Sequence, residues 1–140
     1  MTDKSRLDLV RGSLIGGAAG DALGYPVEFD RYQEIIARYG KPGITNYELT
    51  NGVAEISDDT QMTLFTANGM LMGLTRRYMR GIGGAPEFYV EYAYEDWYKT
   101  QMKSYDDAMA QDDKFCSNRH TWLSAIPELY ARRAPGNTCM

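Results

Sequence analysis

Apolar residues recur three and four positions apart along most of this sequence, and this spacing constrains the fold more than any other feature. The first such stretch begins at Ser5, which suits a helix N-cap, and runs towards Asp21. Its apolar positions are Leu7, Val10, Leu14 and Ala18. A repeat of about 3.6 residues is that of an α-helix, whereas a strand needs strict alternation, which no stretch of useful length shows. The sequence therefore predicts an all-α fold.

Caps and stops predict two further helices in the first part of the chain. A short helix is expected over residues 30–39, because Asp30 suits its start and Gly40 its end. After a loop, a long helix is predicted over residues 57–81, because Ser57 is a good N-cap. Apolar residues occupy more than one face of this second helix, so we expect it to be central and buried.

Proline positions shape the predictions for the rest of the chain. Pro86 suits the first turn of a helix, and another helix is expected over residues 121–132 despite Pro127. Aromatic residues gather on the helix that follows Pro86 and are expected to belong to the core rather than to a base-stacking site. They are Phe88, Tyr89, Tyr92, Tyr94, Trp97 and Tyr98. Residues 103–119 are rich in aspartate and are expected to form an exposed connection.

Glycines fall four residues apart on the first predicted helix. They are Gly12, Gly16 and Gly20, and Gly24 continues the series. Because glycine lowers helix stability relative to alanine, such a stripe indicates very close approach by another backbone or by a ligand. A helix crossing with small residues at the contact is the simpler of these two explanations.

Composition excludes several partners and compartments. With 19 acidic against 15 basic residues the net charge is -4, so the chain has no electrostatic footprint for nucleic acid. The first residues are polar, and Arg11 and Asp21 interrupt the apolar run that follows, so neither a signal peptide nor a membrane span is expected. Cys116 and Cys139 form no CxxC pair, which fits reduced thiols in the cytoplasm better than a zinc site.

Adjacent carboxylates stand at the start of the long central helix. Ser57, Asp58 and Asp59 are followed by Thr60, which gives an all-oxygen set of donors. Hard divalent cations such as Mg²⁺ and Ca²⁺ prefer oxygen ligands, so the motif predicts a metal corner. The alternative is an ordinary N-cap whose acidic neighbours interact with the helix dipole.

A second acidic motif follows the first helix. Asp21 lies between two glycines, and Glu28 follows a turn that contains Pro26, so Glu28 is delivered from a rigid loop. Asp21 either ends its helix or serves as a buried hydrogen-bonding anchor that orders the loop. The alternative for Glu28 is a solvated carboxylate without a role in the site.

Taken together, three stretches of the sequence resemble the ADP-ribosylglycohydrolase family. They are Gly16-Gly17-Ala18-Ala19-Gly20-Asp21-Ala22-Leu23-Gly24-Tyr25-Pro26-Val27-Glu28, then Ser57-Asp58-Asp59-Thr60-Gln61-Met62-Thr63, and finally Arg133-Ala134-Pro135-Gly136-Asn137-Thr138. The resemblance implies an orthogonal all-helical bundle around two magnesium ions, with manganese as a possible substitute. It also implies hydrolysis of the glycosidic bond that joins ADP-ribose to a protein side chain or to a small acceptor.

The resemblance also implies roles for individual residues. Ser57, Asp58 and Asp59 are the expected metal ligands, and Glu28 is the expected catalytic residue beside the metals. The small residues of the first helix are then expected to pack under this site.

Arg132 and Arg133 are candidate phosphate contacts, although two arginines at a helix end also complement its dipole. His120 is the only histidine and is expected to have a surface or capping role.

One family feature has no match in the sequence, the Asp-x-Asp-Thr motif of the second metal half-site. Residues 1–140 are therefore expected to be the N-terminal part of a single ADP-ribosylglycohydrolase-like domain, an incomplete and inactive half. The alternative is a non-catalytic helical module derived from the family. In either case we expect exposed apolar surface, including part of residues 62–72, and self-association through it.

Overall fold

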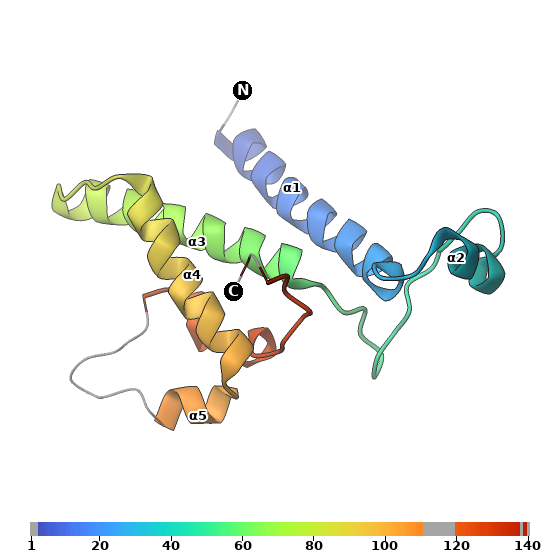
Figure 1. The fold of residues 1–140 in the computed structure, drawn as a ribbon. Coiled ribbons are helices and arrows are strands. Elements are labelled where there is room, and N and C mark those ends of the chain that lie inside the picture. Colours follow the sequence, from blue (N-terminus) through green and yellow to red (C-terminus); the bar gives the residue numbers. More distant parts are fainter. Residues whose placement is uncertain (1–2, 111–119, 138, 140) are drawn as a thin grey trace. The chain divides into compact units, whose positions relative to one another are not determined.

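A computed structural model describes residues 3–110, 120–137 and 139. The α-helices are α1 (Asp3–Gly24), α2 (Tyr32–Tyr39), α3 (Asp58–Arg80), α4 (Pro86–Met102) and α5 (Tyr105–Ala110), and short 3₁₀ helices span Tyr25–Val27, Leu123–Ala125 and Pro127–Leu129 (Figure 1). No strand occurs among the described residues, which confirms the predicted all-α fold. None of the described helices is both long and apolar enough to cross a membrane.

The chain divides into two compact units, residues 1–60 and residues 61–140. In the first unit, α1 covers the predicted first helix, and α2 ends at Gly40 with a φ of 79° as expected. The start of α2 differs from the prediction, because its N-cap is Arg31 and the Glu34 carboxylate accepts the Arg31 backbone N–H at 2.6 Å.

A loop connects α2 to α3 and is fastened by side-chain contacts within the first unit. Arg38 forms an ion pair with Glu48 at 2.8 Å, and the Tyr39 hydroxyl donates to the same carboxylate at 2.6 Å. The Tyr47 hydroxyl donates to the Ala19 carbonyl of α1 at 3.2 Å. The loop is thereby attached to both α2 and α1.

Within the first unit, the glycine stripe of α1 does not form the predicted close contact. A Cβ atom built at Gly12, Gly16, Gly20 or Gly24 would have no described atom within 4 Å. Apolar side chains on the same helix are also exposed, among them Val10 at 58% and Ile15 at 69%. Within the described part of the first unit, neither a helix crossing nor packing beneath the acidic motif uses these glycines.

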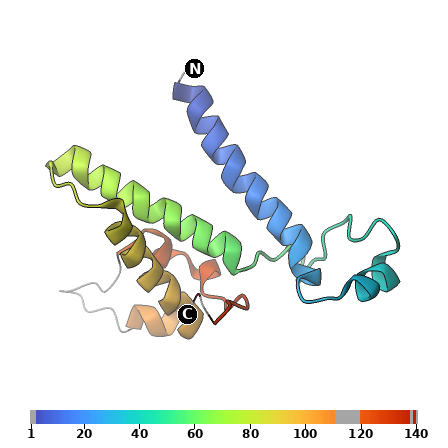
Figure 2. The ribbon, with the colours of Figure 1, turned by 45° about the horizontal axis from the view of Figure 1, so that its top comes forward.

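In the second unit, α4 crosses α3 at very short range (Figure 2). A Cβ atom at Gly69 of α3 would lie 2.6 Å from the backbone oxygen of Tyr89 in α4. The core of this unit lies beside the crossing and contains Phe65, Ala93, Trp97 and Leu129. The absence of a side chain on α3 therefore allows the two backbones to meet.

A buried polar network joins α3, α4 and the last described segment of the second unit. The Gln61 side-chain oxygen accepts the Trp97 indole N–H at 3.2 Å and the Gln101 amide at 2.8 Å. The Gln61 amide donates to the Ala131 carbonyl at 3.1 Å. Asp96 is buried as well, and its carboxylate accepts the backbone N–H of Thr121 at 2.7 Å. Each of these polar groups is therefore satisfied without water.

Three predictions for the second unit need refinement or correction. The exposed connection expected over residues 103–119 contains a short helix, α5, which has no buried residue, and Ser104 caps it by accepting the Asp107 N–H at 3.1 Å. Residues 111–119, with Asp112, Asp113 and Cys116, lie outside the described residues. Residues 121–132 do not form one helix, because Pro127 has no N–H to donate and holds Ile126 extended at φ -101° and ψ 109°.

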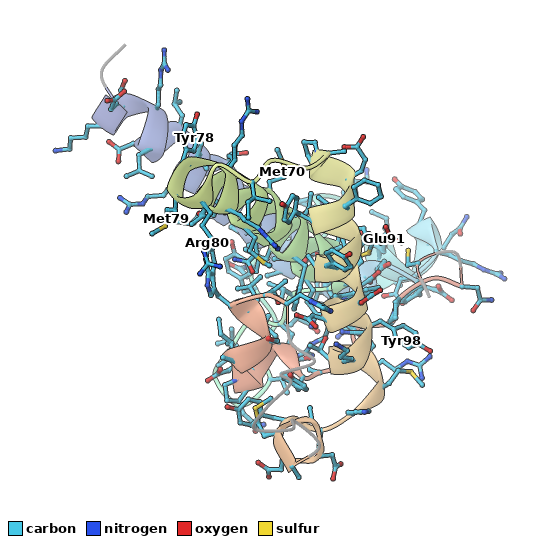
Figure 3. The ribbon with its side chains drawn as sticks, turned by 90° about the vertical axis from the view of Figure 1, so that its left-hand side faces the viewer. Met70, Tyr78, Met79, Arg80, Glu91 and Tyr98 are labelled. Atoms are coloured by element: carbon cyan, nitrogen blue, oxygen red, sulfur yellow. The ribbon has the colours of Figure 1, made fainter. Side chains whose placement is uncertain are left out.

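The third correction concerns the burial of α3. Its first half carries Phe65, which is fully buried, but Leu71 and Leu74 are about half exposed. Figure 3 shows Met70, Tyr78, Met79 and Arg80 on α3 and Glu91 and Tyr98 on α4. Tyr78 and Met79 are exposed at 83% and 79%. Although α3 has apolar residues on several faces, it is buried only where α4 and the segment around Leu129 cover it.

Candidate metal centre

The first turn of α3 carries the acidic motif. Ser57 precedes the helix, and its hydroxyl oxygen accepts the backbone N–H of Asp59 at 3.1 Å, which is an N-cap contact. Ser57 and Asp58 are buried, whereas Asp59 is exposed. Capping is therefore present, and the two carboxylates stand at the positive end of the helix dipole. A hydroxyl oxygen has two lone pairs, so the cap leaves one on Ser57 for another partner.

Asp21 reaches this turn from α1. Its Oδ2 atom accepts the Ser57 backbone N–H at 2.8 Å and the Thr60 hydroxyl at 2.5 Å. Of the two roles considered from the sequence, the structure shows hydrogen bonding rather than the end of a helix. Asp21 is half-buried, however, and its partners lie at the start of α3 rather than in the loop that carries Glu28. These hydrogen bonds bring together the two acidic motifs, which lie 36 to 39 residues apart in the chain.

Glu28 lies close to the same carboxylates. It follows the 3₁₀ helix Tyr25–Val27 and donates its backbone N–H to the Tyr25 carbonyl at 3.2 Å. Desolvation raises the pKa of Glu28, and three neighbouring carboxylates raise this pKa further. In order of effect they are Asp58, Asp59 and Asp21. The loop therefore holds Glu28 within electrostatic reach of the acidic motif, although the residue is exposed. Its catalytic role stays a prediction.

Asp58 is also affected by its neighbours. Burial raises the pKa of Asp58, its own backbone N–H opposes that rise, and the charges of Asp59 and Asp21 add to it. A carboxylate whose pKa is raised by neighbouring negative charges is held close to groups that repel it, and a bound cation would relieve this repulsion.

The donor set fits a hard cation by its chemistry. Ser57, Asp58, Asp59 and Glu28 offer only oxygen atoms, which suits Mg²⁺. Among the described residues, however, no group of three or more histidine, cysteine, aspartate or glutamate side chains already converges as a metal site. Within the described residues, the motif thus offers oxygen donors but does not enclose an ion.

Comparison with known proteins decides the family. The model of the ADP-ribosylglycohydrolase family matches residues 2–140. The chain belongs to the ADP-ribosylglycohydrolase family. Searches of curated proteins and of solved structures found no match. Membership supports a hydrolase function of the ADP-ribosylglycohydrolase type and, with it, ADP-ribosylated substrates.

The two arginines suggested as phosphate contacts belong to the second unit of this ADP-ribosylglycohydrolase chain. Arg132 is exposed, and Arg133 donates its backbone N–H to the Gln101 side-chain oxygen at 3.3 Å. They follow a 3₁₀ helix rather than end an α-helix, so a contribution to a helix dipole does not explain them. Their contact with substrate stays a prediction.

The histidine and the aromatic cluster also lie in the second unit. His120 is exposed, stacks on Tyr92 with ring centroids 5.0 Å apart, and approaches Glu95 at 3.4 Å. These contacts fit the expected surface role. Tyr89 and Trp97 are buried as the core interpretation requires, but Phe88, Tyr92 and Tyr98 are 42% to 58% exposed.

The contact that Thr60 makes was not predicted from the sequence. The residue is part of the quoted motif, and its hydroxyl is the second donor to Asp21. A usable signal was present, because Thr60 lies one helical turn after Ser57, so one acceptor can reach both. The identity of that acceptor depends on tertiary contacts and could not be read from spacing.

Proposed function

We propose that this chain supplies one side of a magnesium-dependent ADP-ribosylglycohydrolase centre. The substrate would carry ADP-ribose on a protein side chain or on a small acceptor, and the glycosidic bond between them would be cleaved. The supporting observation is the position of Glu28 near Asp58 and Asp59. Desolvation raises the pKa of Glu28, and the charges of Asp58, Asp59 and Asp21 raise it further. Mn²⁺ would replace Mg²⁺ with the same oxygen ligands.

Each residue has a distinct part in this proposal. Asp58 and Asp59 would hold the cation through carboxylate oxygens, and Ser57 would add the lone pair that capping leaves on its hydroxyl. Glu28, with its raised pKa, would hold or release a proton at a carboxylate oxygen beside the substrate. The bound cations would supply charge stabilisation and orient water and ribose hydroxyls.

We propose further that these 140 residues bind the cation weakly and do not hydrolyse substrate by themselves. Two-metal hydrolysis needs ions about 3.5 to 4 Å apart and held from both sides. The sequence has no Asp-x-Asp-Thr motif for a second side. Misplacement by about 1 Å can lower the rate by orders of magnitude. The expected result is no magnesium-dependent release of ADP-ribose from a modified arginine or serine peptide, and release abolished by Asp58→Asn would overturn it.

The second candidate is a non-catalytic helical module. The observation in its favour is the N-cap contact between Ser57 and the Asp59 N–H, which accounts for Ser57 and the nearby acids without a metal. Self-association belongs to both proposals, because Met70 and Leu71 on α3 are about half exposed. A sedimentation experiment that finds only monomer over a wide concentration range would contradict self-association.

Metal titration discriminates between the two candidates. Calorimetry with Mg²⁺ should detect weak binding by the wild type, and Asp58→Asn and Asp59→Asn should each reduce the affinity because an anionic ligand is lost. Asparagine still interacts well with a helix N-terminus, so capping alone predicts little change in stability. Asp106→Asn, at the start of α5, is the matched control and should leave the affinity unchanged. Equal affinity in all four proteins would favour the non-catalytic module.

A further inference from the structure

Asp21 makes a two-point contact with the turn that carries the expected metal ligands. Its Oδ2 atom accepts one hydrogen bond from the backbone of Ser57, before α3, and one from the side chain of Thr60, inside the first turn. Ser57 and Thr60 are exposed by only 2% and 7%. The two donors flank Asp58 and Asp59 in sequence, so one carboxylate oxygen fixes the backbone on both sides of the acidic pair.

We propose that Asp21 is a positioning residue that sets the directions of the Asp58 and Asp59 carboxylates for a divalent cation. This inference rests on the proposed function. Asp21 acts through the first turn of α3, and its Oδ2 atom is not itself a metal ligand, because both of its lone pairs are engaged by Ser57 and Thr60. Thr60 is the second residue on which this positioning depends, since its hydroxyl donates a hydrogen bond to Asp21 from within the helix.

The contact depends on an acceptor oxygen rather than on charge alone. Asparagine places a carbonyl oxygen where Asp21 has Oδ2, so Asp21→Asn keeps an acceptor for both donors, whereas Asp21→Ala removes it. The same logic applies to the partner, because Thr60→Ser keeps the hydroxyl and Thr60→Val removes it at similar volume. Rescue by the two conservative variants is therefore the signature of positioning.

Titration with Mn²⁺ followed by electron paramagnetic resonance tests this on the full chain. Asp21→Ala and Thr60→Val should each weaken Mn²⁺ binding by about tenfold or more, as loss of groups that orient metal ligands commonly does. Asp21→Asn and Thr60→Ser should stay within about threefold of the wild type, because the hydrogen bonds persist. The double variant D21A/T60V should bind no more weakly than D21A, since both changes break the same contact.

Tyr47→Phe is the matched control. It removes another hydrogen bond to α1, the one to the Ala19 carbonyl, without touching the start of α3. Its Mn²⁺ affinity should equal that of the wild type. A loss as large as that of Asp21→Ala would mean that any loosening of the first unit weakens the metal, which would overturn a specific role for Asp21.

Amide hydrogen exchange provides a second readout that does not need the metal. The Ser57 amide should lose protection in Asp21→Ala and keep it in Asp21→Asn, and unchanged protection in Asp21→Ala would overturn the inference. Absence of Mn²⁺ binding by the wild type would overturn the proposed function and leave Asp21 no metal ligands to position. Equal binding by the wild type and Asp21→Ala would overturn only the inference about Asp21.

Discussion

Two pairs of glycines have the same spacing and opposite surroundings. Gly16 and Gly20 lie four residues apart in α1, and no described atom lies within 4 Å of a Cβ built on either. Gly69 and Gly73 are also four apart, in α3, and Cβ atoms there would lie 2.6 and 2.7 Å from atoms of Tyr89. The spacing therefore shows where a helix permits close approach, and only the tertiary structure shows where that approach occurs.

The energetic consequences of the two pairs differ in sign. In α3, the missing side chains let α4 pack against the helix backbone, so the loss in helix propensity is offset by packing. In α1, the glycines lower helix propensity and gain no contact within the described residues. Replacement by alanine therefore distinguishes the two cases directly.

Gly69→Ala should give the largest effect. The new methyl group would clash with the Tyr89 backbone oxygen and the Val90 Cα, which cannot move without shifting α4. We expect the free energy of unfolding to fall by about 1 to 3 kcal/mol or more, measured by urea denaturation. Gly73→Ala meets the Tyr89 ring instead, and Tyr89→Ala should relieve its cost but not that of Gly69→Ala. Unchanged stability in Gly69→Ala would contradict the close crossing.

Gly16→Ala should have a smaller effect of opposite sign. Because alanine favours helix and meets no neighbour, α1 should be stabilised by about 0.5 to 1 kcal/mol, seen as a higher midpoint in thermal denaturation followed by circular dichroism. Gly12→Ala should behave alike. A loss of stability or of Mn²⁺ binding in either variant would mean that the stripe is covered in solution and would remove the contrast with α3.

The smallest effect concerns pH and the carboxylates at the start of α3. Folding raises the pKa of Glu28 above 4.5 and that of Asp58 above 3.8, so in this window the folded chain binds more protons than the unfolded chain. These groups therefore cost stability as the pH rises through their folded pKa values. In the presence of a chelator, the melting temperature of Asp58→Asn relative to that of the wild type should increase from pH 4 to pH 7. A constant difference would show that folding does not raise the pKa of Asp58.

Local signals predicted much of the fold. Apolar spacing predicted the existence of α1, which starts before Ser5 and ends after Asp21, and Ser57 as cap predicted the start of α3. Gly40 and Gly81 adopt the positive φ expected where helices end. The prediction over residues 121–132 was wrong because the periodic pattern outweighed Pro127, which in fact divides the segment into two short turns. Local chemistry at the proline decided this case.

The sequence identified candidate site residues but did not predict which of them contact one another, because those contacts join residues far apart in the chain. Ser57, Asp58, Asp59 and Glu28 were selected from the sequence, and the structure brings Glu28 into electrostatic reach of the aspartates. Their metal and catalytic roles stay predictions. The bond between Asp21 and Thr60 joins residues 39 apart, and no local pattern specifies which acceptor meets a given hydroxyl. Such pairings follow from how α1 and the start of α3 are packed.

The uneven distribution of buried apolar residues has a consequence for proteolysis. Among the described residues of the first unit only Ala22 is a buried hydrophobic residue, whereas the second unit buries Phe65, Tyr89, Ala93, Trp97 and Leu129. Segments with few buried apolar contacts open at lower free energy than the global unfolding transition. Residues 3–60 should therefore open sub-globally while the second unit stays folded, and a protease should cut there first. A cation that binds only the closed form would slow this cleavage in proportion to its occupancy.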